Sequence, residues 1–349
     1  MTRLTLAAVL VAVVVLSACG KSTSQLARQA DIYASTPSQA DIRTLLQDDN
    51  WWAGVPSFRV LPLDAATFPL NEQFGITQPF LHLGTAEDLV VRYDVFDTTS
   101  GATTTMSDLK TAHTNSPTTP KVGDDTLYTV FLSEGGAPFV YRTYVRVSQV
   151  IVTIAWAHRN PAPTVQQLSK NAHLVADGLK KALAGKIRGS LKPVGAGELP
   201  PPGRDITPLG STRLPIEAWV VMGRIALMDT FLQVIKKAGL TDFAFGDYAL
   251  NNDTHMEVQT ALVKFGSATD ASDWASVATG SQADQNGIAS TYLPTGGTPA
   301  AGEYHYVFAA ASYGALLVCK PSLDGEAATR ECEGPMERTA LAWKIALGG

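Results

Sequence analysis

The stretch TLYTVFLSEGGAPFVYRTYVRVSQVIVTIAWA, residues 126–157, contains three β-strands in succession. Residues 126–132, 139–147 and 150–157 are rich in the β-branched and aromatic residues that favour strands. The pair Gly135-Gly136 lies between the first two, where glycine supplies the positive φ that a tight hairpin turn requires. This stretch therefore predicts an antiparallel sheet.

An amphipathic helix follows these strands. It begins at Pro163-Thr164, and one face carries apolar residues at helical spacing: Val165, Leu168, Ala172, Val175, Leu179 and Ala182. Upstream, Ser38 and Asp41 form a capping-box pattern before a short helical stripe that ends near Asp48. The N-terminal half is thus predicted to pack helices on its sheet.

The same order of elements recurs in the C-terminal half. Leu132-x-x-Gly135-Gly136-x-Pro138 corresponds to Leu293-x-x-Gly296-Gly297-x-Pro299, and Phe96-x5-Ala102 corresponds to Phe265-x5-Ala271. In both halves two apolar strands and an amphipathic helix follow the Gly-Gly pair, and the last helix is expected from about Pro335. The pattern indicates an internal duplication.

Residues 186–215 separate the two halves. They contain six Pro and five Gly, which is typical of an extended and fairly stiff linker. We therefore predict an α+β fold with two similar domains, residues 38–185 and 216–349, each an antiparallel sheet packed by amphipathic helices.

The N-terminus resembles the precursor of a bacterial lipoprotein. A short basic region, Thr2-Arg3, precedes the apolar run Leu4–Leu16, and Leu16-Ser17-Ala18-Cys19 resembles a lipobox. The apolar run is shorter than the roughly 20 residues that span a bilayer. An ordinary secretory signal and a short membrane anchor remain alternatives.

The lipobox resemblance implies a processing route and an address. Residues 1–18 would be removed as a signal peptide, Cys19 would carry diacylglycerol and palmitate-type acyl chains, and residues 19–37 would form a lipidated tether. The chain would then be anchored by lipid in the cell envelope, on the outer side of the cytoplasmic membrane or in the outer membrane. As a whole it is similar to duplicated secreted lipoproteins of unknown function, and its strand-then-helix order is similar to the Mog1/PsbP-like α+β fold.

Charge and cysteine content restrict the partners. The formal net charge is -5 and no basic run occurs, which argues against nucleic acid as a partner. Besides Cys19 the chain has Cys319 and Cys332, an even pair for which a disulfide is expected outside the cytoplasm. Two buried free thiols are the alternative, and metal binding is disfavoured because no further Cys or His lies near them in sequence.

The familiar catalytic patterns are absent from the sequence. The six His residues include no pair at i, i+4 spacing, and neither a Gly-x-Ser-x-Gly motif nor a phosphate-binding glycine loop occurs. We therefore predict no catalytic residues, no metal site and no cofactor.

Two clusters are candidates for contact with a ligand. Arg142, Tyr144 and Arg146 alternate on one face of a predicted strand, where they could bind an anionic or sugar ligand; the alternative is a solvated face on which the Arg stems cover the Tyr ring. Trp51-Trp52 could form a sugar or lipid platform, or could instead fill the edge of the core.

Together these observations favour a non-enzymatic lipoprotein of the cell envelope. It would attach to the membrane through its N-terminal lipid and bind an envelope protein or a ligand there. The alternatives are a carrier of an apolar molecule, with a pocket between sheet and helix, and an enzyme whose site is assembled from scattered residues.

Overall fold

The computed structural model describes most of the chain beyond the N-terminal segment. The described residues are 30–58, 72–82, 85, 87–113, 120–131, 139–158, 162–189, 198–201, 203–223, 235, 238–250, 253–279, 283–294, 302–320 and 326–349. Cys19 and both Gly-Gly pairs lie outside them.

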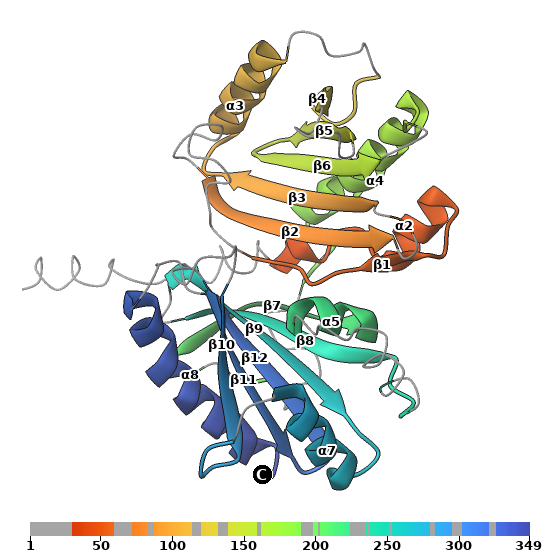
Figure 1. Ribbon diagram of the computed structural model, residues 1–349. Helices are drawn as coiled ribbons and strands as arrows, with labels where there is room; N and C mark the ends of the chain where they lie inside the picture. Colours follow the sequence, from red (N-terminus) through yellow and green to blue (C-terminus); the bar gives the residue numbers. More distant parts are fainter. Residues whose placement is uncertain are drawn as a thin grey trace, which may run out of the picture.

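The first domain contains a six-stranded antiparallel sheet, the upper sheet in Figure 1. Its order is β1-β2-β3-β6-β5-β4, so that β1 and β4 are the edge strands. The strands are β1 (Trp51–Ala53), β2 (Glu72–His82), β3 (Asp88–Phe96), β4 (Asp125–Phe131), β5 (Phe139–Val147) and β6 (Val150–His158). The three strands expected between residues 126 and 157 are therefore confirmed.

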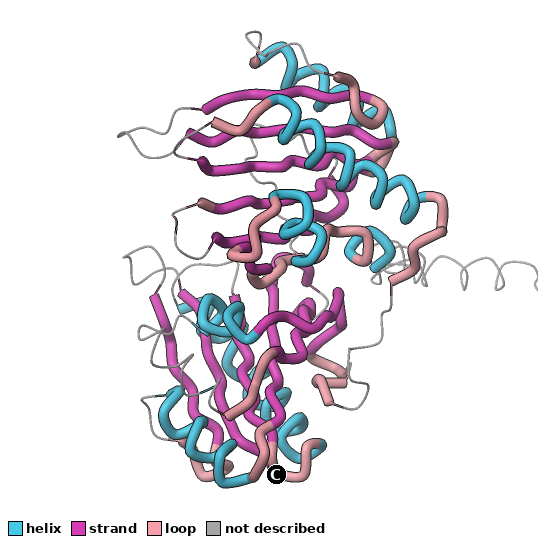
Figure 2. Tube along the Cα trace, turned by 90° about the vertical axis from the view of Figure 1, so that its right-hand side faces the viewer, coloured by secondary structure: helices cyan, strands magenta, loops and turns pink. Residues whose placement is uncertain are grey.

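The second domain repeats this sheet. Its order is β7-β8-β9-β12-β11-β10, which is the first sheet with six added to each strand number. The strands are β7 (Ile206–Pro215), β8 (Asp242–Leu250), β9 (Asp253–Lys264), β10 (Ile288–Pro294), β11 (Gly302–Ala310) and β12 (Tyr313–Lys320). The predicted α+β fold with two similar domains is confirmed, and the two sheets run in clearly different directions (Figure 2).

Local details also match between the domains. The amide of Phe96 donates to Gln149 O at 2.9 Å, and the amide of Phe265 donates to Ser312 O at 2.8 Å. Both acceptors lie in the turn between the two strands next along the sheet. Ala102 and Ala271, the partners of these phenylalanines in the sequence repeat, are both fully buried. The repeat seen in the sequence thus marks equivalent positions in two copies of one fold.

Helices cover both faces of each sheet. In the first domain α4 (Val165–Leu183) packs on the main core, with α2 (Gln39–Leu46) beside it, and α3 (Thr99–Ala112) packs on the opposite face. In the second domain α8 (Glu326–Ala346) covers one face, and α5 (Ile216–Gly223) and α7 (Ala268–Thr279) cover the other. The capping box of Ser38 and Asp41 is present at the start of α2.

The predicted linker is too long at its C-terminal end. Residues 206–215 form β7, an edge strand of the second sheet, so the second domain does not begin at residue 216. An edge strand tolerates proline because one side of it needs no ladder hydrogen bonds. Residues 198–201 also pack on the second domain, since Trp343 Nε1 donates to Glu198 O at 2.6 Å and Tyr248 Oη to Pro200 O at 2.9 Å.

The predicted tether is likewise too long. Ala30 and Ile32 are buried, and Asp31 accepts hydrogen bonds from Arg188 Nη1 at 2.7 Å and from the Gly189 amide at 2.8 Å. Residues 30–37 therefore belong to the first domain. The chain just beyond α4 supplies the partners of Asp31, whereas the hydroxyls of Ser35 and Thr36 donate to carbonyl groups within the segment, Ile32 O and Tyr33 O.

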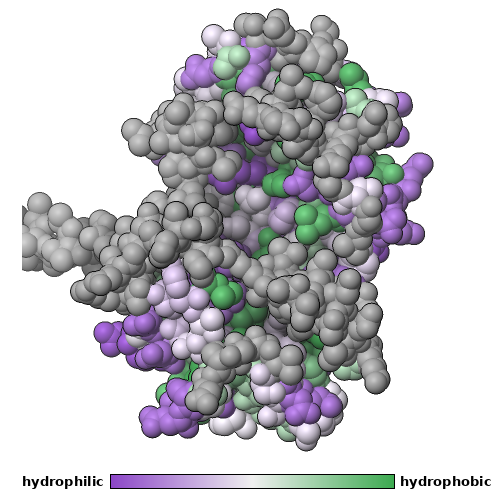
Figure 3. Space-filling view, viewed as in Figure 1, coloured by the Kyte–Doolittle hydropathy of each residue, from purple (hydrophilic) through white to green (hydrophobic). Residues whose placement is uncertain are grey.

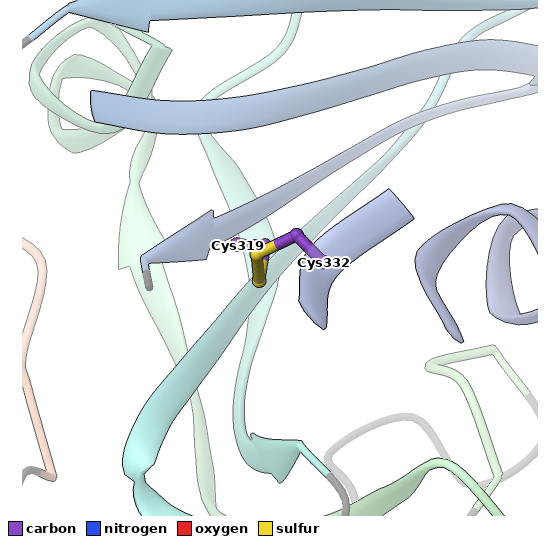
Figure 4. Close-up of a disulfide and its surroundings, with 2 residues drawn as sticks. All are labelled: Cys319 and Cys332. Carbon is purple, nitrogen blue, oxygen red and sulfur yellow. A yellow bond between two sulfur atoms is a disulfide. The ribbon is translucent and has the colours of Figure 1, made fainter. Parts of the chain in front are cut away.

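A disulfide joins Cys319 at the end of β12 to Cys332 on α8, as expected (Figure 4). The last helix begins at Glu326 and not near Pro335, so Cys332 lies within it. Pro335 marks an interruption of the backbone hydrogen bonding rather than a helix start. Both cysteines are fully buried in the core between α8 and the sheet, where the bond ties the helix to the strand.

Candidate binding cleft between the two domains

A cleft of about 830 Å³ lies where the two domains meet. One wall comes from the first domain, from the segment before α2, from β1 and from Gln78 of β2. The other comes from the second domain, from the end of β7, the start of α5 and the turn before β8. Both walls include an edge strand, because β1 and β7 are the outermost strands of their sheets. Apolar side chains are visible between the two domains in Figure 3.

Side chains of α2 hold the outer edge of β1. Gln39 Oε1 accepts a hydrogen bond from the Ala53 amide at 2.9 Å, and Arg43 Nε donates to Trp51 O at 2.8 Å. These two residues lie four apart, so they project from the same face of the helix. The Ala53 amide and the Trp51 carbonyl on the open edge of β1 thus have hydrogen-bond partners. In this way α2 holds the part of the cleft wall that β1 forms.

The two adjacent tryptophans have different roles. Trp51 is buried in the core, with its ring edge-on to His82 and to Trp156. Trp52 is partly exposed and lines the cleft, and the Arg43 guanidinium lies 4.5 Å from its ring centroid. The core interpretation is therefore right for Trp51, whereas Trp52 offers an aromatic surface to the cleft.

The wall from the second domain combines apolar and acidic residues. Leu214 and Ile216 are buried behind it, and Leu240 is partly exposed. Arg213 forms an ion pair with Asp242, with Nη1 2.8 Å from Oδ1. Glu217, in the first turn of α5, also lines the cleft. The lining therefore suits a largely apolar ligand with a few polar groups.

The domains contact each other directly beside this cleft. Within the first domain, the ring of Tyr33, a cleft residue, packs against the ring of Phe58 with centroids 4.6 Å apart. The Phe58 amide donates to two buried carboxyl groups of the second sheet, Asp247 Oδ2 at 3.1 Å and Glu257 Oε1 at 3.3 Å. Gln259 Nε2 adds a hydrogen bond to Pro56 O at 3.0 Å.

The predicted Arg142–Tyr144–Arg146 face is not a free surface. Tyr144 is buried beneath α3, in a cluster with Phe96, Met106, Leu127 and others. Arg146 Nη1 donates to Ser148 O at 3.2 Å and lies 3.4 Å from Asp124 Oδ2. Arg142 is partly buried on the same face. The strand alternation identified the shared face correctly, but the helix that covers part of it excludes Tyr144 from ligand contact.

A second polar cluster consists of Asp48, His82 and Thr85, which no sequence motif connects. His82 Nε2 lies 2.8 Å from Asp48 Oδ2, and His82 Nδ1 lies 2.8 Å from Thr85 Oγ1. Hydrogen bonds from the Asn50 amide and from His82 lower the pKa of Asp48, so this carboxylate is ionised and accepts from Nε2–H. In the tautomer with its hydrogen on Nε2, Nδ1 is the acceptor for the Thr85 hydroxyl. None of the three lines the interdomain cleft.

The sheet–helix interface of the first domain leaves little space. A small void between α2, α4 and the sheet, bounded by Leu89, Val91 and Asn171, is too small to admit a water molecule. The expected carrier pocket between sheet and helix therefore has no counterpart at this position. Among the described residues, no group of three or more His, Cys, Asp or Glu side chains is placed to hold a metal ion.

The cleft and its acidic neighbours are not evident from the sequence. Their residues are spread over positions 33–78 and 212–259, with no shared motif. One signal is present in the sequence, because Asp247 interrupts an apolar strand, and Glu257 and Gln259 lie within the next strand. Polar residues in such strands are buried only where partners exist for them.

Comparisons with known proteins identify no family. No family model matches the chain, and no curated protein matches it. Among solved structures, the extracellular domain of PknH from Mycobacterium tuberculosis is similar at 10% identity, over 43% of this chain and 94% of that one, with a TM-score of 0.35. A score this low carries no argument about function. In the part of the chain that the structure describes, no helix is both long and apolar enough to cross a membrane.

Proposed function

We propose that this chain is a lipoprotein of the cell envelope that binds a ligand in the cleft between its two domains. The observation that carries the proposal is the cleft itself, about 830 Å³ in size and lined from both domains. Clefts at domain interfaces of this size are preferred sites for small ligands. The lipobox resemblance of residues 16–19 supports the envelope address.

The ligand chemistry follows from the lining. Trp52 and Leu240 offer partly exposed apolar surface, and Gln39, Thr241 and Asp242 surround it with polar groups. A ligand with an apolar body and a few hydrogen-bonding groups fits this arrangement. A polyanion does not, because the ion pair with Asp242 already neutralises Arg213, and the remaining charged residue of the lining, Glu217, is acidic.

Native mass spectrometry of the full-length protein, extracted gently from its own membrane, tests this proposal. We expect a small molecule to remain bound to the wild type and to be lost from Leu240→Arg, which places a long charged side chain in the cleft. Leu341→Arg, on the outer face of α8 and 36% exposed, is the matched control and should retain the molecule. A wild type without bound ligand, or equal retention by both variants, would contradict the proposal.

The anchor is tested separately. Cys19→Ser removes the thiol that would accept diacylglycerol, and a hydroxyl does not replace it in that transfer. In cells fed a clickable fatty acid, the wild type should be labelled and the Ser variant unlabelled. Label persisting on the variant would refute lipidation at this residue.

A second candidate function is hydrolysis at the Asp48–His82–Thr85 cluster. Its hydrogen bonds give a hydroxyl, a histidine base and an orienting carboxylate in the order used by acyl-transfer enzymes. The Thr85 hydroxyl would attack the acyl carbon of an ester while His82 takes its proton, and His82 would pass this proton to the departing alcohol or phenol. A water molecule, deprotonated by His82, would then release the acid and restore the Thr85 hydroxyl. Turnover of aryl esters that is lost in Thr85→Val, and kept in Thr103→Val on the exposed side of α3, would establish it; equal rates in both variants would exclude it.

A further inference from the structure

The contact between the domains is built around two buried acids that the cleft itself does not use. We propose that Asp247 and Glu257 hold one proton between them, and that this proton locks the domains together beside the cleft. Release of the proton would open the junction. The effect on ligand binding rests on the proposed function above, whereas the lock itself does not.

The two acids lie side by side on one face of the second sheet. Asp247 on β8 is directly opposite Gln259 on β9, and Glu257 lies two residues before Gln259 on the same face. Asp247 is 0% exposed and Glu257 is 1% exposed. Water therefore cannot separate their charges.

One backbone amide is shared by both acids. The Phe58 N–H points at Asp247 Oδ2 and at Glu257 Oε1, 3.1 and 3.3 Å away, so oxygens of both acids lie around the same hydrogen. Two carboxylates this close in a buried site do not both ionise, because each charge raises the cost of the other. A proton on Asp247, donated to the Glu257 carboxylate, removes the repulsion.

The charges around the two acids are consistent with a proton on Asp247. Burial and the neighbouring Glu257 raise the pKa of Asp247 well above its ordinary value, and Lys320 and the Phe58 amide only partly offset them. The described groups around this site are Glu257 on β9, Lys320 opposite it on β12, Tyr33 of the first domain and Tyr248 next along β8. Burial also raises the pKa of both tyrosines, so that they stay neutral.

The acids are connected to the cleft by a short chain of contacts. The amide of Phe58 donates to the acids, and its ring packs at a tilt against Tyr33 in the cleft wall. Gln259 Nε2 donates to Pro56 O. Residues 53–58 are also tied to the first sheet, since the Gly54 amide donates to Pro79 O at 2.8 Å and Ser57 pairs with Thr77. Movement of this segment away from the second sheet therefore moves the first wall of the cleft away from the second.

The direction of the pH dependence follows from the raised pKa of Asp247. A carboxyl that is easier to protonate in the folded junction than in solvent favours the closed junction at low pH. That contribution is lost as the pH rises through the raised pKa, when Asp247 releases its proton to solvent and two buried negative charges remain. The junction should then admit water and separate.

Spin labels on the full-length protein in detergent micelles test the lock. Thr103→Cys on α3 and Ser272→Cys on α7 place one label on an exposed site in each domain. We expect a narrow distance distribution at low pH that broadens and lengthens as the pH rises. In Asp247→Asn, whose amide is neutral at every pH and can donate to Glu257, the distribution should stay narrow throughout. Asp177→Asn, exposed on α4, is the control and should behave as the wild type.

Infrared spectroscopy gives a readout that does not depend on a variant. At pH values above the ordinary titration range of an aspartate, the wild type should still show the carbonyl band of a protonated carboxylic acid. This band should disappear over the pH range in which the distance lengthens. A distance that does not change with pH, or an acid band that disappears within the ordinary titration range of an exposed carboxyl, would overturn the proposal. Because no ligand is added, such a failure would leave the native mass spectrometry test of the cleft unaffected.

Discussion

The similarity of the two domains extends to the backbone conformation of single residues. Ser148 and Ala311 adopt positive φ, 55° and 47°, in the tight turns between β5 and β6 and between β11 and β12. Non-glycine residues avoid this region because Cβ crowds the following carbonyl group. The two-residue turn requires it, so both copies accept the same local strain at the same place.

Replacing Ala311 with glycine should therefore stabilise the protein. We expect Ala311→Gly to raise the free energy of unfolding by about 0.5–1 kcal/mol, because glycine adopts positive φ without the Cβ contact. The matched control Ala342→Gly, exposed within α8, should lower it by about 1 kcal/mol. Chemical denaturation measures both. A loss of stability in Ala311→Gly would show that the turn is not strained.

Among the helices and strands, the sequence predicts those whose apolar or β-branched residues recur in a regular pattern. Strands 125–131, 139–147 and 150–158 and helix α4 have their expected positions, since β-rich runs or an apolar stripe mark them. Strand β8 is not recognisable in this way because it is buried on both faces after its first residue, so it has no alternation. In the sequence, strand β7 looks like part of the linker, because Pro208, Gly210 and Pro215 are residues typical of irregular structure. An edge strand nevertheless accommodates all three.

The helix α8 depends on its link to β12. The disulfide closes a loop with a sequence separation of 13 residues, which contributes about 3 kcal/mol in the chain-entropy model. Reduction should lower the free energy of unfolding by about that amount, and hydrogen exchange should rise first in α8. Denaturant unfolding with and without reductant gives the comparison. Identical midpoints would mean that packing around Trp343 alone holds the helix.

In the whole molecule, the junction beside the cleft depends on contacts between residues far apart in the chain. Phe58 meets Asp247 and Glu257, 189 and 199 residues away. No local pattern encodes such a meeting, so the cleft could not be predicted from the sequence. The presence of two similar domains could be predicted from the sequence. The edge strands β1 and β7 of these two domains form part of the cleft walls.

The close fit at the junction depends on a glycine. A Cβ atom at Gly210 of β7 would overlap the ring of Phe58. Gly210→Val should therefore force Phe58 off the second sheet and separate the domains, which small-angle scattering would detect as a larger radius of gyration. Gly203→Val is the control, because the nearest atom to an added Cβ there is Pro201 O at 4.0 Å. Equal radii for the two variants would contradict this arrangement.

The central claim, that both domains hold one ligand, has a direct test. A photoreactive amino acid is placed in living cells at Trp52 on one wall, at Leu240 on the other, and at Thr103 on α3 as a control. After irradiation, intact mass spectrometry of the full-length protein reports each adduct. We expect the same added mass at both cleft positions and none at Thr103. Different masses at the two walls, or the same mass at all three positions, would show that the two domains do not share one ligand.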